Sequence, residues 1–200
     1  MTATICDTRP CELGEGAFWH PERQQLFWFD ILKARMLSFD ATGPLAWQFD
    51  EMHSAAGWID RDTLLLASET GLWRFEIRTG ARERLAEIEA EDDRTRSNDG
   101  RADPHGGFWI GTMGKHAEPE AGAIYRYAEG KVTRLYDSIS IPNAICFSPD
   151  GTTAYFADTA RQIVWRVALD AGGWPRGERE VFLDLRSEGL FPDGAVTDAE

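Results

Sequence analysis

The feature that most constrains the fold is a unit of about 40 to 50 residues that recurs along the chain. Each copy contains a strand, a turn, a second strand, a loop and further strand segments. Aligning the copies brings five turn residues to one position: Pro21, Arg61, Pro104, Pro149 and Ala199. A repeat of this length matches one four-stranded blade of a propeller. The spacing therefore predicts an all-β fold, a β-propeller, with four blades and the start of a fifth.

The local pattern of the chain agrees with this repeat. Short alternating runs such as QLFWFD, TLLLAS, GLWRFE and TAYFAD are rich in aromatic and β-branched residues and are separated by Gly, Pro and Asp turns, which is typical of strands. The segment 84–96 is the one candidate helix, but it has few apolar positions and we interpret it as an acidic loop. The eight tryptophans are expected to pack between blades.

Composition narrows the domain organisation and the classes of partner. With 200 residues and 42% hydrophobic content, we expect one propeller domain over residues 1–200, truncated at its C-terminus relative to a closed ring. A net charge of −13 argues against nucleic acid as a partner. No apolar run has signal-peptide or membrane-span length. The cysteines Cys6, Cys11 and Cys146 form no metal or redox motif, so we expect a cytoplasmic protein. The oligomeric state stays open.

Equivalent positions on the repeats gather oxygen-bearing side chains. The residues six positions before the aligned turns are Glu15, Ala55, Asn98, Asn143 and Asp193. In a radial fold, equivalent positions on the innermost strands converge on the axis of the channel. Four of these five residues carry side-chain oxygens, so the sequence predicts a central site that they surround. The alternative interpretation is that Asn and Asp sit at strand starts as turn formers.

Two carboxylates and two carboxamides suit a hard divalent cation. Calcium fits these ligand types best, and zinc, manganese, magnesium or iron(II) remain possible. Strand alternation places Arg96 on the same face as Asn98, where it could bind a substrate oxygen; a surface ion pair is the alternative. Asp99 is expected to be a turn residue. The insert 113–122 is a candidate substrate loop. No G-x-S-x-G motif is present, which argues against a Ser/His nucleophile.

Several separated motifs occur in a recognisable order: LGEGAFW, RSNDGRADPHGGFWIGTMG, AGAIYRY, IPNAICFSPDG and FPDGAVTDAE. On these motifs the chain resembles the gluconolactonase/regucalcin (senescence-marker protein) family of metal-dependent sugar lactonases. The resemblance implies a six-bladed propeller with one divalent metal in its channel. It further implies that Glu15, Asn143 and Asp193 bind the metal, that Asp193 is also the general base, and that Arg96 and Asn98 bind substrate.

The expected function is therefore hydrolysis of a sugar (aldono)lactone to the aldonic acid. The metal would polarise the lactone carbonyl, and Asp193 would act as the base or orient the attacking water. Two alternatives stay open: a hydrolase of related architecture that acts on organophosphates or aryl esters, and a non-enzymatic propeller that binds calcium or protein. The sequence does not specify which lactone or which metal is used.

Overall fold

The computed structural model describes residues 4–198, and its regular secondary structure is almost entirely antiparallel β-strand. Its strands form four sheets of four strands each. The first sheet comprises β1 (Gly14–His20), β2 (Gln25–Asp30), β3 (Arg35–Asp40) and β4 (Gly43–Gln48). The second comprises β5 (His53–Asp60), β6 (Thr63–Ser68), β7 (Gly71–Glu76) and β8 (Arg82–Glu87).

The other two sheets repeat this arrangement in the second half of the chain. The third sheet comprises β9 (Thr95–Ala102), β10 (Phe108–Gly114), β11 (Gly122–Ala128) and β12 (Lys131–Ile139). The fourth comprises β13 (Pro142–Phe147), β14 (Thr153–Asp158), β15 (Ile163–Leu169) and β16 (Pro175–Asp184). Two short 3-10 helices, η1 (Thr159–Arg161) and η2 (Arg186–Glu188), follow strands of this sheet.

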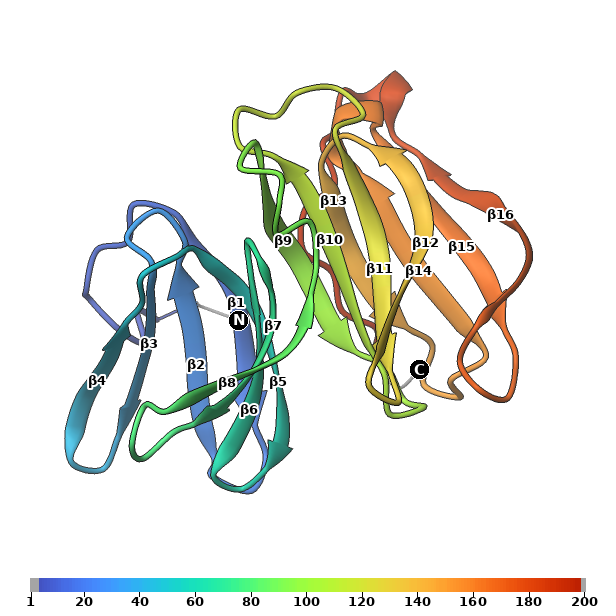
Figure 1. Cartoon of the computed structure of the whole chain (residues 1–200). Coiled ribbons are helices and arrows are strands. Elements are labelled where there is room, and N and C mark those ends of the chain that lie inside the picture. Colours follow the sequence, from blue (N-terminus) through green and yellow to red (C-terminus); the bar gives the residue numbers. More distant parts are fainter. Residues whose placement is uncertain (1–3, 199–200) are drawn as a thin grey trace.

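The sheets are arranged as successive propeller blades. Strand β5 contacts both β1 and β9, and β9 also contacts β13, so the first strand of each sheet is the innermost one. Figure 1 shows the first two blades, in blue to green, beside the last two, in yellow-green to red. Pro21, Arg61, Pro104 and Pro149 all lie in the turn between the first two strands of a blade, which confirms the predicted register; Ala199 lies outside the described residues.

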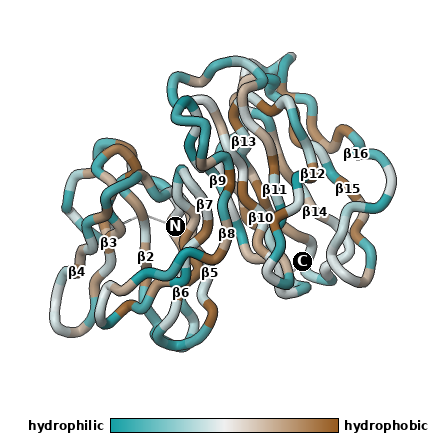
Figure 2. The backbone as a smooth tube through the Cα atoms, in the orientation of Figure 1, coloured by the Kyte–Doolittle hydropathy of each residue, from teal (hydrophilic) through white to brown (hydrophobic). Residues whose placement is uncertain are grey.

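The core lies between neighbouring blades, where the facing sheets pack their apolar side chains against each other. One apolar cluster joins blades one and two around Phe29, Leu64 and Phe75. A second joins blades two and three around Leu65 and Phe108, and a third joins blades three and four around Trp109, Phe147 and Phe156. In Figure 2 the hydrophobic segments follow the strands, and hydrophilic segments dominate the connecting loops.

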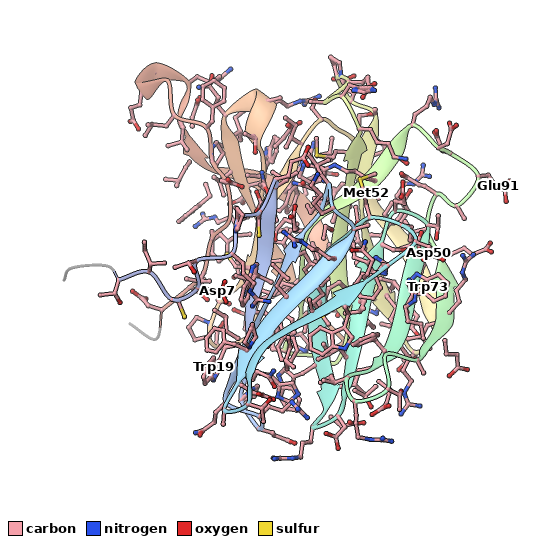
Figure 3. The ribbon with its side chains drawn as sticks, turned by 90° about the vertical axis from the view of Figure 1, so that its left-hand side faces the viewer. Asp7, Trp19, Asp50, Met52, Trp73 and Glu91 are labelled. Atoms are coloured by element: carbon pink, nitrogen blue, oxygen red, sulfur yellow. The ribbon has the colours of Figure 1, made fainter. Side chains whose placement is uncertain are left out.

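The expectation that all eight tryptophans pack in the core is only partly correct. Trp109 and Trp165 are buried, and Trp47 and Trp73 pack against the first cluster at its margin. Trp73 lies near Asp50 in Figure 3, and Arg82 joins them by stacking on the indole ring and pairing with the carboxylate. Trp19 and Trp58 instead keep about half of their surface in solvent, at 56% and 43% exposure. Both lie near the turn ends of innermost strands, and the ring of Trp58 packs on one side against His20 of blade one, with centroids 5.6 Å apart.

The interpretation of residues 84–96 as a loop is also partly wrong. Residues 84–87 belong to strand β8, and 95–96 begin strand β9, so only the segment 88–94 connects blades two and three. The charged residues of β8 are tolerated because the outermost strand of a blade has one side in solvent. Most of the predicted insert 113–122 is a loop: residues 115–121 connect β10 and β11, and the other three residues belong to those strands.

Candidate metal and substrate site

The structure brings the four predicted oxygen-bearing residues to one cavity. Glu15 of β1, Asn98 of β9, Asn143 of β13 and Asp193 all line a cavity of about 570 Å³. The fifth equivalent position, Ala55 of β5, is buried in the apolar cluster between blades two and three. The site therefore draws its polar groups from blades one, three and four and from the segment that follows blade four.

Each site residue on an innermost strand lies where strand pairing is interrupted. The β1–β2 register shifts between Glu15 and Phe18, and the β13–β14 register shifts between Asn143 and Cys146. The residues that follow Glu15 and Asn143, namely Gly16 and Ala144, both have left-handed backbone, with φ of 61° and 56°. Such bulges bend a strand and redirect its side chains. They turn Glu15 and Asn143 toward the cavity.

A third irregularity explains why Asp99 belongs to this site, contrary to the prediction that it is a turn residue. The β9–β10 register shifts between the Thr112–Ser97 pair and the Ile110–Gly100 pair. Adjacent residues of a regular strand point to opposite faces, but the shift lets Asn98 and Asp99 line the same cavity. Oδ2 of Asp99 accepts a 2.8 Å hydrogen bond from the backbone N–H of Ile145. Asp99 thus ties blade three to the irregular stretch of β13.

Arg96 and Asn98 contact each other, as strand alternation predicts. Nη1 of Arg96 donates to Oδ1 of Asn98 at 2.9 Å and to the carbonyl oxygen of Ser97 at 2.8 Å. Arg96 is buried, with 8% exposure, so its interpretation as a surface ion-pair residue is wrong. Asn98 Nδ2 donates to the carbonyl oxygen of Pro142 at 2.9 Å and to Oδ1 of Asn143 at 3.1 Å.

Asp193 lies on a segment without assigned strand structure, held against blades three and four by side-chain hydrogen bonds. Thr159 Oγ1 donates to the carbonyl oxygen of Pro192 at 2.6 Å, and Arg101 Nη2 donates to that of Ala195 at 3.0 Å. Thr197 Oγ1 donates to the carbonyl oxygen of Phe147 at 2.6 Å. These contacts on both sides of Asp193 place it beside residues that lie far away in the sequence.

Two carboxyl groups of the site, those of Glu15 and Asp99, have raised pKa values. Burial, followed by the negative charges of Asp193 and Asp99, raises the pKa of the Glu15 carboxyl. Burial also raises the pKa of Asp99, and Asp193 adds to this effect. Burial lowers the pKa of the Arg96 guanidinium, an effect that the negative charges of Glu15 and Glu69 oppose. Three acidic groups that repel one another in a partly buried cavity form an environment that a cation would stabilise.

The donor set fits a hard divalent cation. Glu15 and Asp193 supply carboxylate oxygens, and Asn143 supplies an amide oxygen; calcium takes both types with flexible geometry. Among residues 4–198, no group of three or more His, Cys, Asp and Glu side chains is placed to hold a metal ion. A cation here would therefore be held by an amide oxygen together with carboxylates from opposite ends of the chain. This ligand set differs from the Cys- and His-rich sites that zinc prefers.

The histidines take no part in the site within the described part of the chain. Ring nitrogens of His20, His53 and His105 bond to the backbone carbonyl oxygens of Asp60, Glu51 and Gly151. No bond between a histidine ring and a hydroxyl is formed among residues 4–198. Likewise, none of the helices among these residues is long and apolar enough to cross a membrane.

Sequence reasoning assigned no role to two residues that shape this site, Arg101 and Thr159. Arg101 follows the R-S-N-D-G motif by one residue and lines the cavity, but its contact with Ala195 spans more than 90 positions and leaves no local signal. Thr159 follows the strand TAYFAD, where a hydroxyl is ordinarily an unremarkable loop residue. Its role becomes visible only once Asn143 and Pro192 lie on either side of it.

Comparison with known proteins places the chain in a family. The model of the SMP-30/Gluconolactonase/LRE-like region matches residues 13–200, and the chain belongs to this family. An L-arabinolactonase of Azospirillum brasilense is 35% identical over 98% of this chain and 67% of its own length. The pentonolactonase XacC of Haloferax volcanii is 33% identical over 100% of this chain and 68% of its own length.

A solved structure shows that the fold is shared in detail. The crystal structure of regucalcin, a calcium-binding protein of Agrobacterium tumefaciens, is 44% identical and superposes with a TM-score of 0.94 over 97% of this chain and 67% of the regucalcin chain. This likeness confirms the β-propeller fold. The chain spans about two thirds of the length of the relatives that it matches.

Proposed function

We propose that this chain carries the central site of a sugar-lactone hydrolase. The observation that carries the proposal is the convergence of Glu15, Asn98, Asn143 and Asp193 on one cavity. The names of the relatives support it, since they include a pentonolactonase and an L-arabinolactonase. A sugar lactone is small and rich in hydroxyl groups, which suits a cavity lined by carboxylate, amide and guanidinium groups.

Glu15, Asn143 and Asp193 are the residues that would hold a divalent cation, with calcium favoured by the ligand types. A bound cation would supply Lewis-acid polarisation of the lactone carbonyl and stabilise the negative charge that develops on its oxygen. The calcium-binding regucalcin that this chain resembles supports this assignment.

The remaining steps belong to side chains of this chain. The Asp193 carboxylate takes a proton from water as the water oxygen forms a bond to the carbonyl carbon. The bond from that carbon to the ring oxygen then breaks, and the ring oxygen becomes a hydroxyl by taking back the proton that Asp193 had accepted, which regenerates the carboxylate. Asn98 lines the cavity, where its Oδ1 can accept a hydrogen bond from a substrate hydroxyl. Arg96, which does not line that cavity, fixes the orientation of Asn98. No covalent enzyme intermediate is needed, because lactones of this kind are already reactive toward water.

The test of this proposal is the substitution Asp193→Asn in the 200-residue chain, assayed on pentono- and hexonolactones with calcium present. Loss of the base is expected to lower kcat/KM by about 10²- to 10⁴-fold. The matched control is Asp62→Asn, which changes an exposed carboxylate that pairs with Arg23 and should leave kcat/KM unchanged. Undiminished lactone hydrolysis by Asp193→Asn would exclude the assigned base.

A second candidate is calcium binding without turnover, which the likeness to calcium-binding regucalcin favours. The same preparation distinguishes the two functions. Calorimetric titration with calcium reports binding, and the lactone panel reports turnover. Binding without hydrolysis of any lactone in the panel would replace the lactonase proposal with this second function.

A further inference from the structure

Thr159 occupies a central place in a hydrogen-bond chain that crosses the site. Its hydroxyl lies 2.6 Å from the carbonyl oxygen of Pro192 and 2.8 Å from Nδ2 of Asn143. Pro192 directly precedes Asp193. Thr159 therefore contacts one assigned cation ligand, Asn143, directly and holds the backbone that carries a second, Asp193.

The direction of each hydrogen bond in this series follows from the groups at its two ends, which can act only as donor or only as acceptor. A backbone carbonyl can only accept, so the Thr159 hydroxyl must use its single hydrogen to donate to Pro192. The oxygen of Thr159 can then only accept from Asn143, which must present its NH₂ group. The Oδ1 atom of Asn143 is thereby directed away from Thr159.

The opposite end of the hydrogen-bond series, at Arg96, requires the same orientation of the Asn143 amide. Arg96 can only donate, so it contacts Oδ1 of Asn98, and Nδ2 of Asn98 then donates to the carbonyl oxygen of Pro142 and to Oδ1 of Asn143. Oδ1 of Asn143 accepts this bond and keeps a second lone pair. A reversed Asn143 amide would place two donors together at Asn98 and leave the close Thr159–Pro192 contact without a hydrogen.

We propose that Thr159 is a positioning residue for the site: it fixes the Asn143 amide with its oxygen available to a cation and fastens the Asp193 segment at a set distance from it. This inference rests on the proposed function for its cation. Partners that orient the ligands of a metal commonly contribute 10- to 100-fold to metal affinity. Thr159 does so without contacting the cation itself.

The test compares Thr159→Val, which keeps the shape and removes the hydroxyl, with Thr159→Ser, which keeps the hydroxyl. The first readout is the calcium affinity of the 200-residue chain by calorimetry, without substrate. Thr159→Val is expected to weaken calcium binding by about 10- to 100-fold, and Thr159→Ser is expected to restore most of it. The second readout is kcat/KM on the lactone panel, which should fall in Thr159→Val and recover in Thr159→Ser.

The matched control is Thr152→Val. Thr152 lies in the turn at the other end of β14, where its hydroxyl bonds to Oδ1 of Asp150, so its loss should leave calcium affinity unchanged. Urea unfolding without metal completes the comparison. A purely structural role for Thr159 would lower the unfolding midpoint of Thr159→Val while its calcium affinity stays at the wild-type value, and that result would overturn the inference.

The outcomes separate this inference from the lactonase proposal. If the wild-type chain binds calcium, hydrolyses no lactone and loses affinity in Thr159→Val, the positioning role stands and the lactonase proposal fails. If lactone hydrolysis and calcium affinity are both unaffected by Thr159→Val, the positioning role fails and the lactonase proposal stands. If the wild-type chain binds no divalent cation, both are overturned.

Discussion

His53 is a residue whose environment holds it neutral. Its side chain is fully buried, at 0% exposure, and its ring packs against Phe49 in a tilted arrangement with centroids 4.1 Å apart. Nδ1 lies 3.0 Å from the carbonyl oxygen of Glu51, and Nε2 lies 3.4 Å from Nη1 of Arg82. Since the carbonyl accepts and the guanidinium donates, His53 carries its proton on Nδ1. Burial lowers the pKa of His53 to about 4, and the charge of Arg82 acts in the same direction.

This shift predicts a loss of stability in mild acid. Below the ordinary histidine pKa of 6.5 the unfolded chain takes up a proton that the folded chain refuses, so the free energy of unfolding falls as pH drops from about 6.5 to about 4. The full loss is about 3 kcal/mol. His53→Gln should make the drop between pH 7 and pH 4.5, measured by urea unfolding, smaller by about 2 kcal/mol. His116→Gln, in an exposed loop, is the control and should reproduce the wild-type drop; equal slopes for all three proteins would contradict the assignment.

At the scale of elements, the site depends on strands that depart from regular pairing. Glu15 and Asn143 each precede a residue with left-handed backbone, and Asn98 and Asp99 share a stretch where the register of β9 shifts. Regular strands would point alternate side chains away from the axis. Glycine is required at one of these positions: a Cβ on Gly16 would lie 2.0 Å from the carbonyl oxygen of Ser54 on β5.

Gly16→Ala is therefore expected to damage both the fold and the site. The left-handed backbone alone costs about 1 to 2 kcal/mol for a residue other than glycine, and the collision with Ser54 must be relieved by moving β1 away from β5. The control Gly130→Ala has a similar φ of 77° in a hairpin turn but no atom within 4 Å of the added Cβ. Urea unfolding should show a larger loss for Gly16→Ala, accompanied by weaker calcium binding that Gly130→Ala does not share. Equal losses in both variants would show that the contact with Ser54 is unimportant.

At the scale of the whole molecule, neighbouring blades are joined by apolar clusters, and blade three also contacts blade four through an arginine held by an ion pair within blade three. Arg126 of β11 and Asp103, which follows β9, lie 2.6 Å apart with both side chains almost fully buried. The guanidinium also stacks on Trp174, which lies between β15 and β16, at 4.3 Å from the ring centroid. Blades three and four are thus joined near their turns, while Asn98 and Asn143 join them at the candidate site.

Breaking this pair should destabilise the molecule without altering the site. Asp103→Asn leaves the Arg126 charge buried without its counter-ion, which costs about 3 to 5 kcal/mol. The exposed Asp62–Arg23 pair offers a control, because Asp62→Asn should cost less than about 1 kcal/mol. Chemical denaturation measures both losses, and calcium titration below the transition should give wild-type affinity for each variant. A small effect of Asp103→Asn would show that the stacking on Trp174 alone suffices.

The prediction from sequence succeeded where equivalent positions repeat. Counting back from the turn residues led to Glu15, Asn98, Asn143 and Asp193, and the structure gathers all four at one cavity. It failed for Asp99, because strand alternation cannot anticipate a bulge. It also failed for Trp19 and Trp58, because apolar character alone does not reveal whether a neighbouring blade covers a residue.

By itself, the sequence determined the strands, the turns and the period of the blade, because turn chemistry and side-chain alternation act over a few neighbouring residues. Only the tertiary structure decided that Asp99 and Arg101 line the cavity, that Thr159 lies between Asn143 and Pro192, and which way the amides of the site point. Those features depend on contacts between residues tens of positions apart. Their hydrogen-bond directions exist only once all the partners are in place.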